Sequence, residues 1–242
     1  MIPTLLLLIV SCPCIGSTLT DATQGHVHDM LQPPSSRPIP TAQQQSLLDY
    51  DFGLSMMGHF GIATFANTDN PCTSHGCPHV SSFNPGKVNA TEIVKTAVDM
   101  GASELCMTAH HGAGFVMWFS NYTDYGVKFS SYQKDVLAAV AQECRQQGIH
   151  ICYYFDLGDG YDSSHGVPAE EITQKQIGFL TELLGDPQYG PIHRLWLDDY
   201  FAAVPFWQNM SQTLFQKLSP DTLTVPGWDG WCVELRWLWL CA

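Results

Sequence analysis

The feature of this sequence that most constrains its fold is a regular alternation between short apolar runs and longer segments with apolar residues at helical spacing. The short runs, which predict strands, cover residues 54–65 with the loop that leaves the strand, 105–109, 149–155, 192–197 and 222–225. The segments with helical spacing cover residues 89–100, 134–147, 169–184 and 205–218. Alternating strands and helices are typical of a parallel sheet, whose strands are apolar almost throughout because helices cover them. The order of elements leaves both a barrel and an open sheet possible.

The chain has too few predicted strands for a complete (β/α)8 barrel. Such a barrel has eight strand–helix units, whereas the pattern provides four units and a fifth strand. Residues 227–242 hold four tryptophans and fit no sixth unit, so we expect an atypical Trp-rich tail there. The hydrophobic content of 45% and aromatic content of 12% are sufficient for a substantial core and argue against disorder.

The amino terminus has the features of a secretory signal. Residues 5–10 form an apolar run too short to span a bilayer, and small residues follow it up to Gly16. We therefore expect a signal peptide at residues 1–16, a flexible leader at 17–46 and no stable membrane insertion. Asn-x-Ser/Thr motifs at Asn89, Asn121 and Asn209 are candidate glycosylation sites. The expected localisation is the secretory pathway, with the lysosome or vacuole and the extracellular space both open.

Secretion affects the interpretation of the cysteines. The sequence has nine cysteines, and removal of residues 1–16 leaves seven, so at least one thiol lacks a partner. Cys72 and Cys77 flank a polar loop and are the disulfide candidate. Cys106 and Cys152 lie in apolar runs and are expected to be buried thiols. Two histidines near Cys72 and Cys77 leave zinc as an alternative, but zinc sites usually draw ligand pairs from two separate elements, so we predict no metal site.

The charge balance excludes one class of partner. Ten basic residues against 23 acidic ones give a formal net charge of −13. A surface of this sign repels phosphate backbones, so we expect no nucleic-acid binding. The acidic loop at residues 158–162 lacks a full calcium-binding pattern, and we interpret it as a solvated turn.

Polar and aromatic residues follow the predicted strands, at the edge where α/β enzymes place their sites. Asp198 and Asp199 end the strand at 192–197, where an acid is as compatible with capping the next helix as with catalysis. The other candidates are His59, His110, His111, Trp118, Tyr153, Tyr154 and Trp196. Aromatic rings stack on the apolar faces of sugars, and histidine and aspartate hydrogen-bond sugar hydroxyls, so this set predicts sugar binding.

These motifs, in this order, resemble glycoside hydrolase family 29, the α-L-fucosidases. The segments that carry the resemblance are Pro38-Ile39-Pro40-Thr41 with Met57-Gly58-His59-Phe60-Gly61, then Phe83-Asn84-Pro85, then Thr108 to Trp118 with Ser120-Asn121-Tyr122-Thr123-Asp124-Tyr125, then Tyr153-Tyr154, and Leu195-Trp196-Leu197-Asp198. The resemblance implies the amino-terminal part of a (β/α)8, TIM-like catalytic barrel in residues 47–226, an incomplete α/β fold with about five strands and no cofactor. It also implies a retaining exo-glycosidase that removes terminal α-L-fucose from glycans or glycoproteins.

Roles for single residues follow from the resemblance. Asp198 stands where the family has its nucleophilic aspartate, which forms a covalent glycosyl-enzyme that water then hydrolyses. His59 and His111 match histidines that hold the sugar. Trp118 and one of the two tyrosines at 153 and 154 match aromatic residues of the pocket. Asp199 takes a position where glycine is common, and we interpret it as structural.

Two departures from the family pattern keep an alternative open. The family usually reads Lys-His-His-Asp-Gly-Phe where this chain has His-His-Gly-Ala-Gly-Phe. Aligned without gaps, Gly112 replaces the second histidine and Ala113 replaces the acid, whereas a shift by one residue restores both histidines but misplaces Phe115. The family's general acid/base lies beyond the matched portion, and Glu234, the only late acid of the right type, is not assigned to that role. The alternative is a non-catalytic fucose-binding protein or a truncated pseudo-enzyme. The oligomeric state is not predicted.

Overall fold

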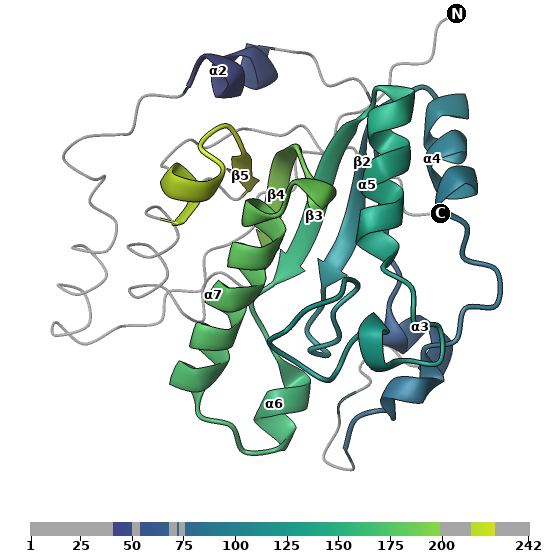
Figure 1. The fold of residues 1–242 in the computed structure, drawn as a ribbon, viewed down its shortest axis with the longest axis vertical. Helices are drawn as coiled ribbons and strands as arrows, with labels where there is room; N and C mark the ends of the chain where they lie inside the picture. Colours follow the sequence, from purple (N-terminus) through teal and green to yellow (C-terminus); the bar gives the residue numbers. More distant parts are fainter. Residues whose placement is uncertain (1–40, 50–53, 68–71, 73–75, 199–213, 226–242) are drawn as a thin grey trace, which may run out of the picture. The chain divides into compact units, whose positions relative to one another are not determined.

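The computed structural model describes residues 41–49, 54–67, 72, 76–198 and 214–225. In this part of the chain, five parallel strands form one sheet in the order β1-β2-β3-β4-β5 (Figure 1). The strands are β1 Leu54–Gly58, β2 Ala102–His110, β3 His150–Asp156, β4 Ile192–Asp198 and β5 Leu223–Val225. The helices are α2 Ala42–Asp49, α3 Ile62–Ala66, α4 Ala90–Asp99, α5 Val136–Gln147, α6 Gly160–Ser164 and α7 Ala169–Gly185, with 3-10 turns η1 Val80–Ser82, η2 Val127–Phe129 and η3 Pro187–Tyr189 and a further helical segment at 214–218.

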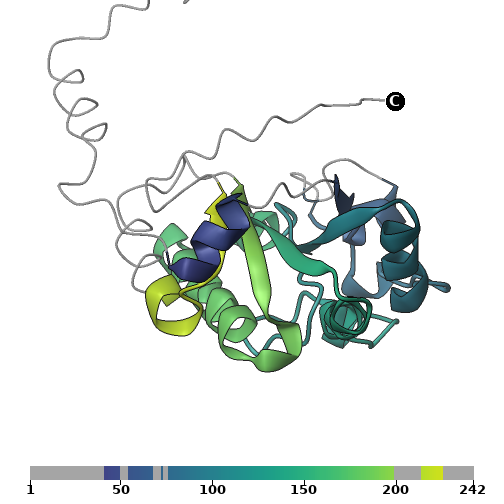
Figure 2. The same cartoon turned by 90° about the horizontal axis from the view of Figure 1, so that it is seen from above.

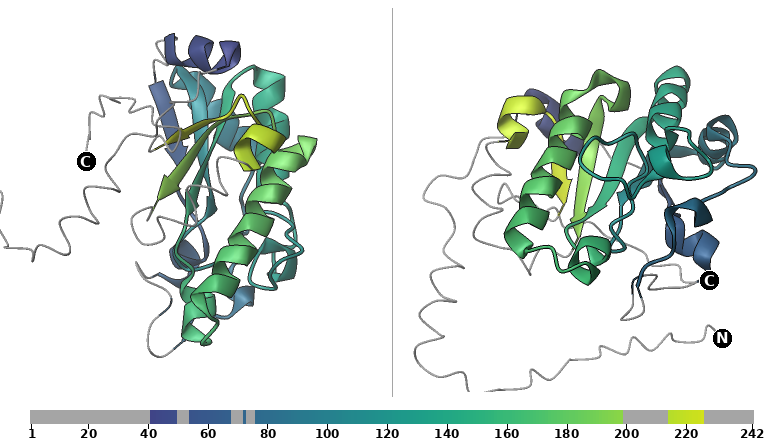
Figure 3. Two further views of the ribbon diagram at one scale, coloured as in Figure 1. Left: turned by 90° about the vertical axis from the view of Figure 1, so that its left-hand side faces the viewer. Right: turned by 60° about the horizontal axis from the view of Figure 1, so that its bottom comes forward.

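The sheet has the topology of a barrel segment. Each strand pairs with the one that follows it in sequence, whereas an open, doubly wound sheet reverses its strand order at a switch point. Helices α4, α5 and α7 lie on one face of the sheet (Figures 1 and 3), as right-handed connections require when the strand order runs in one direction. The view from above shows the same arrangement (Figure 2). The prediction of a (β/α)8-type fold with about five strands is confirmed.

The long helices begin and end where local chemistry predicts. Asn89 caps α4 by accepting from the Thr91 N–H, and Asp135 caps α5 by accepting from the Ala138 N–H at 2.9 Å. Helix α5 ends at Gly148, whose φ of +70° lies in the left-handed region that favours glycine. Apolar side chains of these helices pack on the sheet and form the main core. The predicted strands and long helices are confirmed to within a few residues for the part of the chain that is described.

A bulge in β2 decides which residues near its end face the helices. We call the helix-covered side of the sheet the outer face and the opposite side the inner face. Strand β3 alternates regularly, with Tyr154 inward and Phe155 outward. Thr108 pairs with Tyr154, but His110 already pairs with Phe155, so Ala109 is an extra residue in β2. The alternation therefore shifts by one, and His110 stacks on Phe155 in the outer face, with ring centroids 4.9 Å apart.

The inner face carries a disulfide and a buried ion pair. Cys106 and Cys152 are joined by a disulfide, so the expectation of two free buried thiols is wrong, because the register of β2 and β3 places them opposite each other. Arg194 Nε donates to Glu104 Oε2 at 3.1 Å, and Glu104 is fully buried. Ser55 Oγ donates to Glu104 Oε1 at 2.6 Å, so the ion pair links β1, β2 and β4. Among the described cysteines, Cys144 is the free, buried thiol.

The predicted leader overlaps a folded element. Residues 42–46 belong to α2, near the amino ends of the strands (Figure 1), so the flexible leader expected at 17–46 is wrong over these residues. Thr41 Oγ1 donates to Asp221 at 2.7 Å, and Gln44 Nε2 donates to the Thr222 carbonyl oxygen at 3.2 Å, which attaches α2 to the segment before β5. The predicted signal peptide, Asp199, Asn209 and the Trp-rich tail at 227–242 lie outside the described residues. No helix in the described ranges is long and apolar enough to cross a membrane.

Candidate active site

Five of the predicted site residues meet on the inner face, at the carboxyl ends of the strands. The ring centroid of His59, which follows β1, lies 4.9 Å from that of His111, which follows β2. The Tyr154 ring lies 5.5 Å from His59 and 5.9 Å from His111 by the same measure. The Trp196 ring in β4 lies 5.6 Å from Tyr154. Asp198, the last residue of β4, completes the group through its contact with Tyr154.

Asp198 is held in position by Tyr154. The Tyr154 hydroxyl donates to Asp198 Oδ2 at 2.5 Å, across the pair of neighbouring strands β3 and β4. A hydroxyl bond to a carboxylate at this distance is of the strong, charge-assisted kind. Tyr154 is almost completely buried, whereas Asp198 is exposed. A rigid partner therefore orients the carboxylate while leaving it accessible to a substrate.

The surroundings of His59 favour the neutral form of its imidazole. Burial lowers its pKa below the ordinary value of 6.5, the neighbouring His111 lowers it further, and the charge of Asp198 opposes both. His59 Nδ1 lies 3.1 Å from Thr108 Oγ1, which fixes the ring. In a neutral imidazole one ring nitrogen donates and the other accepts. Such a group can hydrogen-bond a hydroxyl without adding a positive charge to the site.

A cavity of about 610 Å³ adjoins the two histidines. His59 and Phe60 contribute to its wall together with α3, and His111, Ala113 and Phe115 contribute from the segment after β2. Its size is typical of small-molecule sites. Asp198 does not line this cavity. It contacts Tyr154, whose ring in turn packs against both histidines of the cavity wall.

His111 begins a tight turn that α6 supports from behind. The Gly114 N–H donates to the His111 carbonyl oxygen at 2.8 Å, and the Gly114 φ of +85° is one that side-chain-bearing residues avoid. The Gly160 N–H at the start of α6 donates to the Gly112 carbonyl oxygen at 2.7 Å. The position of the imidazole of His111 therefore depends on how α6 is anchored.

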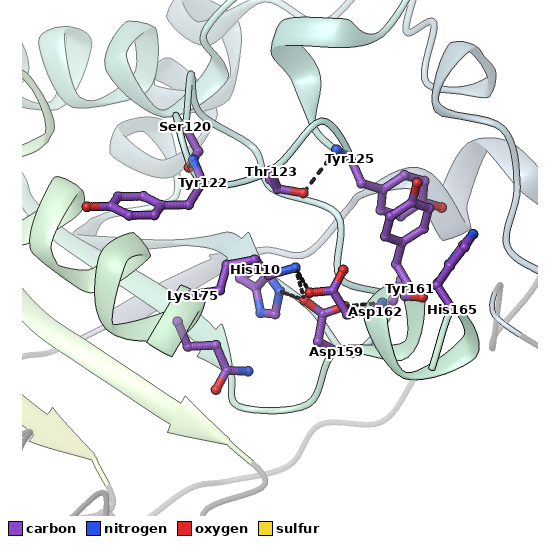
Figure 4. A network of polar contacts seen from close by, with 12 residues as sticks. His110, Ser120, Tyr122, Thr123, Tyr125, Asp159, Tyr161, Asp162, His165 and Lys175 are labelled. Atoms are coloured by element: carbon purple, nitrogen blue, oxygen red, sulfur yellow. Dashed lines mark hydrogen bonds and ion pairs between the residues drawn. The ribbon is translucent and has the colours of Figure 1, made fainter. Parts of the chain in front are cut away.

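A buried charged cluster anchors α6 (Figure 4). The fully buried carboxylate of Asp159 lies 2.9 Å from Lys175 Nζ and 3.9 Å from His110 Nε2, and Lys175 also pairs with Asp162. Burial raises the pKa of Asp159, but His110 and Lys175 outweigh it and hold this pKa below its ordinary value. Asp159 Oδ1 accepts from the Asp162 N–H at 2.9 Å. The interpretation of residues 158–162 as a solvated turn is wrong, because α7 supplies a lysine that no local pattern reveals.

Three predicted sugar-binding residues lie away from the pocket. His110 is completely buried, and its Nδ1 lies 2.7 Å from a main-chain carbonyl oxygen of β3. The Tyr153 hydroxyl donates to the Tyr189 carbonyl oxygen at 2.8 Å, and Trp118 Nε1 donates to Glu182 in α7 at 3.1 Å. All three face the helix layer, so their positions do not support the expected sugar contact. The bulge in β2 explains His110, and strand alternation explains Tyr153.

Cys72 and Cys77 are joined by a disulfide that packs on the turn after His111. Cys72 Sγ lies 3.3 Å from the Ala113 carbonyl oxygen, and Cys77 Sγ lies 3.5 Å from Ser164 Oγ in α6. Cysteine binds zinc as the thiolate, which a disulfide does not provide. The described ranges contain no group of three or more His, Cys, Asp or Glu side chains that could hold a metal ion.

Two inner-face residues at this site, Thr108 and Asp156, are not among the predicted site residues. Thr108 contacts His59, and Asp156 ends β3 in register with Asp198. Strand alternation alone places Asp156 on the same face as Tyr154, so the signal was present in the spacing.

Together, the fold and the site define a class of protein. A barrel-type parallel sheet that presents an oriented aspartate beside histidines and aromatic rings is characteristic of carbohydrate-active barrel proteins. The Alpha-L-fucosidase family profile matches residues 55–233. The chain belongs to this family, glycoside hydrolase family 29.

Individual relatives agree with this assignment. The chain is 35% identical over 165 residues to Alpha-L-fucosidase 1 of Arabidopsis thaliana, a match that covers 66% of this chain and 31% of that protein. It is 30% identical over 209 residues to an Oryza sativa subsp. japonica protein assigned as alpha-L-fucosidase 1, which covers 78% and 39% respectively. A crystal structure from Bacteroides ovatus, assigned as an alpha-L-fucosidase, superposes with a TM-score of 0.66 at 26% identity and covers 79% of this chain and 33% of that one. The chain therefore spans 31% to 39% of the length of these relatives.

Proposed function

We propose that this chain carries the nucleophile and sugar-binding part of a retaining α-L-fucosidase, which removes terminal α-L-fucose from glycans or glycoproteins. The observation that carries the proposal is the geometry around Asp198. Its exposed carboxylate ends β4, has one oxygen held by the Tyr154 hydroxyl at 2.5 Å, and lies beside the paired rings of His59 and His111. Family membership and the name of the Arabidopsis relative support the same reaction.

In this mechanism Asp198 attacks the anomeric carbon of the bound fucose while the bond to the leaving oxygen breaks. The product is a covalent fucosyl-enzyme, and water then displaces the carboxylate and restores the anomeric configuration. The Tyr154 hydrogen bond keeps one carboxylate oxygen fixed, which aligns the attack. His59 and His111 hold sugar hydroxyls, and the Trp196 ring offers an apolar surface to the sugar.

The test is hydrolysis of an aryl α-L-fucoside by this chain and by its Asp198→Asn variant. An activated aryl oxide leaves with little help from a general acid, so the assay isolates the nucleophilic half of the reaction. The isosteric amide cannot form the covalent intermediate, and we expect turnover to fall roughly 10⁴- to 10⁶-fold, the range seen when single residues of a catalytic triad are lost. Fucose binding, measured by calorimetry, should persist.

Asp99→Asn is the matched control, because Asp99 is an exposed acid at the end of α4, away from the site. Azide added to an Asp198→Gly variant should restore release of the aryl oxide and yield a fucosyl azide, since it replaces the missing nucleophile. No release by the folded, unsubstituted chain would refute enzymatic activity. Fucose binding that persists under those conditions would favour the non-catalytic alternative.

We also propose passage through the secretory pathway, with delivery to the lysosome or vacuole or to the extracellular space. The apolar run at residues 5–10 and the presence of a disulfide between Cys72 and Cys77 support this route. Asn89 and Asn121 are exposed, as glycan acceptors must be. Expression in eukaryotic cells tests this route. Amino-terminal sequencing shows whether the signal peptide is removed, and glycosidase treatment shows whether the chain carries glycans. A chain that keeps its first residues and shows no glycan shift would contradict this route.

A further inference from the structure

Thr108 is a buried threonine that joins the carboxyl ends of β1 and β2 beneath His59. It lies in β2 and is only 2% exposed. Its hydroxyl makes two contacts with the neighbouring strand end, because Oγ1 lies 3.1 Å from His59 Nδ1 and 3.5 Å from the Gly58 carbonyl oxygen. His59 itself is exposed, so its ring contacts a buried hydroxyl through Nδ1 while remaining accessible to a ligand.

These two contacts determine which atoms carry the protons. A carbonyl oxygen only accepts, so the contact with Gly58 is a hydrogen bond when Thr108 donates its single hydroxyl proton there. Oγ1 is then an acceptor toward His59, whose Nδ1 carries the proton. A neutral imidazole has one proton for its two nitrogens, and the surroundings of His59 favour that form. The arrangement in which both contacts are hydrogen bonds therefore makes His59 Nε2 an acceptor.

Neighbouring rings keep the imidazole of His59 in this orientation. The ring of His111 lies at an interplanar angle of 81° to it, and the ring of Tyr154 at 77°, so both pack in edge contacts. His59 also contributes to the wall of the cavity of about 610 Å³, together with Thr108 and His111. A ring held by two neighbours and by the bond at Nδ1 presents Nε2 in one fixed position.

We propose that Thr108 is a positioning residue, which accepts from His59 Nδ1–H and so holds the tautomer whose Nε2 accepts a hydrogen bond from a hydroxyl of the bound fucose. The inference rests on the proposed function, because it gives a direction to a sugar contact in the same site. The recognised hydroxyl must donate, so the site distinguishes it from a substituent that can only accept, such as fluorine.

Nitrogen-15 NMR of the chain with labelled histidines, at mildly alkaline pH, tests the tautomer without any substrate. The signals of His59, identified by their loss in His59→Gln, should show a protonated Nδ1 and an unprotonated Nε2. Thr108→Val keeps the branched shape but removes the hydroxyl, so it should give a mixture of tautomers, and Thr108→Ser should restore the original pattern. A protonated Nε2 in the unsubstituted chain, or an unchanged pattern in Thr108→Val, would overturn the inference.

Calorimetry with L-fucose and its deoxy and deoxyfluoro analogues tests the direction of the sugar contact. The contacted hydroxyl is the one whose removal carries no penalty in His59→Ala. At that position, fluorine should recover none of the affinity that the deoxy sugar loses on the unsubstituted chain, since fluorine does not donate. Thr108→Val should weaken L-fucose binding roughly 3- to 10-fold, the effect of about one neutral hydrogen bond. Recovery of affinity by fluorine at that position would contradict an accepting Nε2.

Thr222→Val is the matched control. Thr222 is a buried threonine whose hydroxyl donates to the Ile192 carbonyl oxygen at 2.7 Å, at the amino end of β4. Its substitution should leave the His59 signals and the affinity for L-fucose unchanged. Equal losses of affinity in Thr108→Val and Thr222→Val would show that a buried hydroxyl acts through stability alone, and would overturn the inference.

Two outcomes separate this inference from the proposed function. If the unsubstituted chain hydrolyses the aryl fucoside but His59 carries its proton on Nε2, the inference is overturned and the function stands. If the unsubstituted chain neither hydrolyses the fucoside nor binds L-fucose, the function fails and the sugar contact with it, whichever tautomer the NMR spectrum shows.

Discussion

Replacement of Lys175 by methionine should destabilise the protein strongly, because it removes the cation from the buried cluster behind the turn that His111 begins. The Asp159 side chain is completely buried, and Lys175 Nζ lies 2.9 Å from it. Loss of one partner from a buried ion pair typically costs about 3–5 kcal/mol. The Lys175 side chain is 13% exposed, so we expect the lower end, about 3 kcal/mol.

The deficit should depend on pH. Since the folded-state pKa of Asp159 is held low, its charge contributes stability that is complete above the ordinary value of 3.8 and is lost as pH falls through the folded value. Without Lys175, burial is opposed less and protonation of Asp159 becomes easier. The gap in unfolding free energy between the unsubstituted protein and Lys175→Met should therefore be largest near neutral pH and should narrow as pH falls toward 4.

Urea denaturation at pH 7 and at pH 4.5 measures this gap. A loss of about 3 kcal/mol shifts the urea midpoint by about 1 M at the m-value typical of a domain this size. The matched control is Lys87→Met, since Lys87 is an exposed lysine. Adding Asp159→Asn to Lys175→Met should recover part of the loss, because the completely buried side chain at position 159 is then uncharged. The reasoning is refuted if Lys175→Met is as stable as the control, or if its deficit is unchanged by Asp159→Asn.

Three further predictions concern the sheet and the turn. Arg194→Met should cost about 3–5 kcal/mol of unfolding free energy by leaving the buried Glu104 carboxylate without its cation, and Glu104→Gln should cost less; equal costs in urea denaturation would contradict this. Burial, reinforced by the neighbouring His150, lowers the pKa of His193 to about 4. The free energy of unfolding should therefore fall by about 2 kcal/mol, after allowance for partial exposure, as pH drops from about 6.5 to about 4. A His193→Gln variant whose stability has the same pH dependence as the unsubstituted protein would disprove this. Gly114→Ala should lower both the thermal midpoint and fucoside turnover. The Gly114 φ of +85° disfavours a side chain by about 1–2 kcal/mol, and the new methyl group would overlap Asp159. A variant with a normal midpoint and normal turnover would contradict this account of the turn.

The fold was largely predictable because its main signal is local. Runs of apolar residues and helical spacing depend only on neighbours in sequence, and they placed the strands and long helices of the described chain correctly. What they could not show is register. The disulfide between Cys106 and Cys152 depends on how β2 pairs with β3, which no spacing within either strand reveals.

The candidate site likewise has a part that the sequence predicts and a part that depends on packing between distant segments. Parallel strands end at the same edge of a sheet, and this rule predicts the grouping of His59, His111, Tyr154 and Asp198. The resemblance to a known family, whose motifs occur in the same order, supports the same grouping. The buried lysine that anchors α6 comes from α7, whereas its partners Asp159 and Asp162 lie at the start of α6, and the loop at residues 165–168 separates the two helices. Such a contact depends on helix packing, so the acidic loop was mistaken for a solvent-exposed one.

The extra residue at Ala109 changes which face of the sheet the following side chains of β2 occupy. Before it, Cys106 and Thr108 face inward, whereas Leu105 and Met107 pack beneath the helices; after it, His110 occupies the helix layer and His111 faces the candidate site. Two adjacent, chemically identical side chains thus serve opposite layers of the protein. Regular pairing of Ala109 with Phe155, without the bulge, would exchange their roles and move one imidazole out of the helix layer and the other out of the pocket. The bulge in β2 therefore decides which of the two histidines faces the candidate site, and deletion of Ala109, which removes the bulge, would leave both imidazoles on their present sides of the sheet.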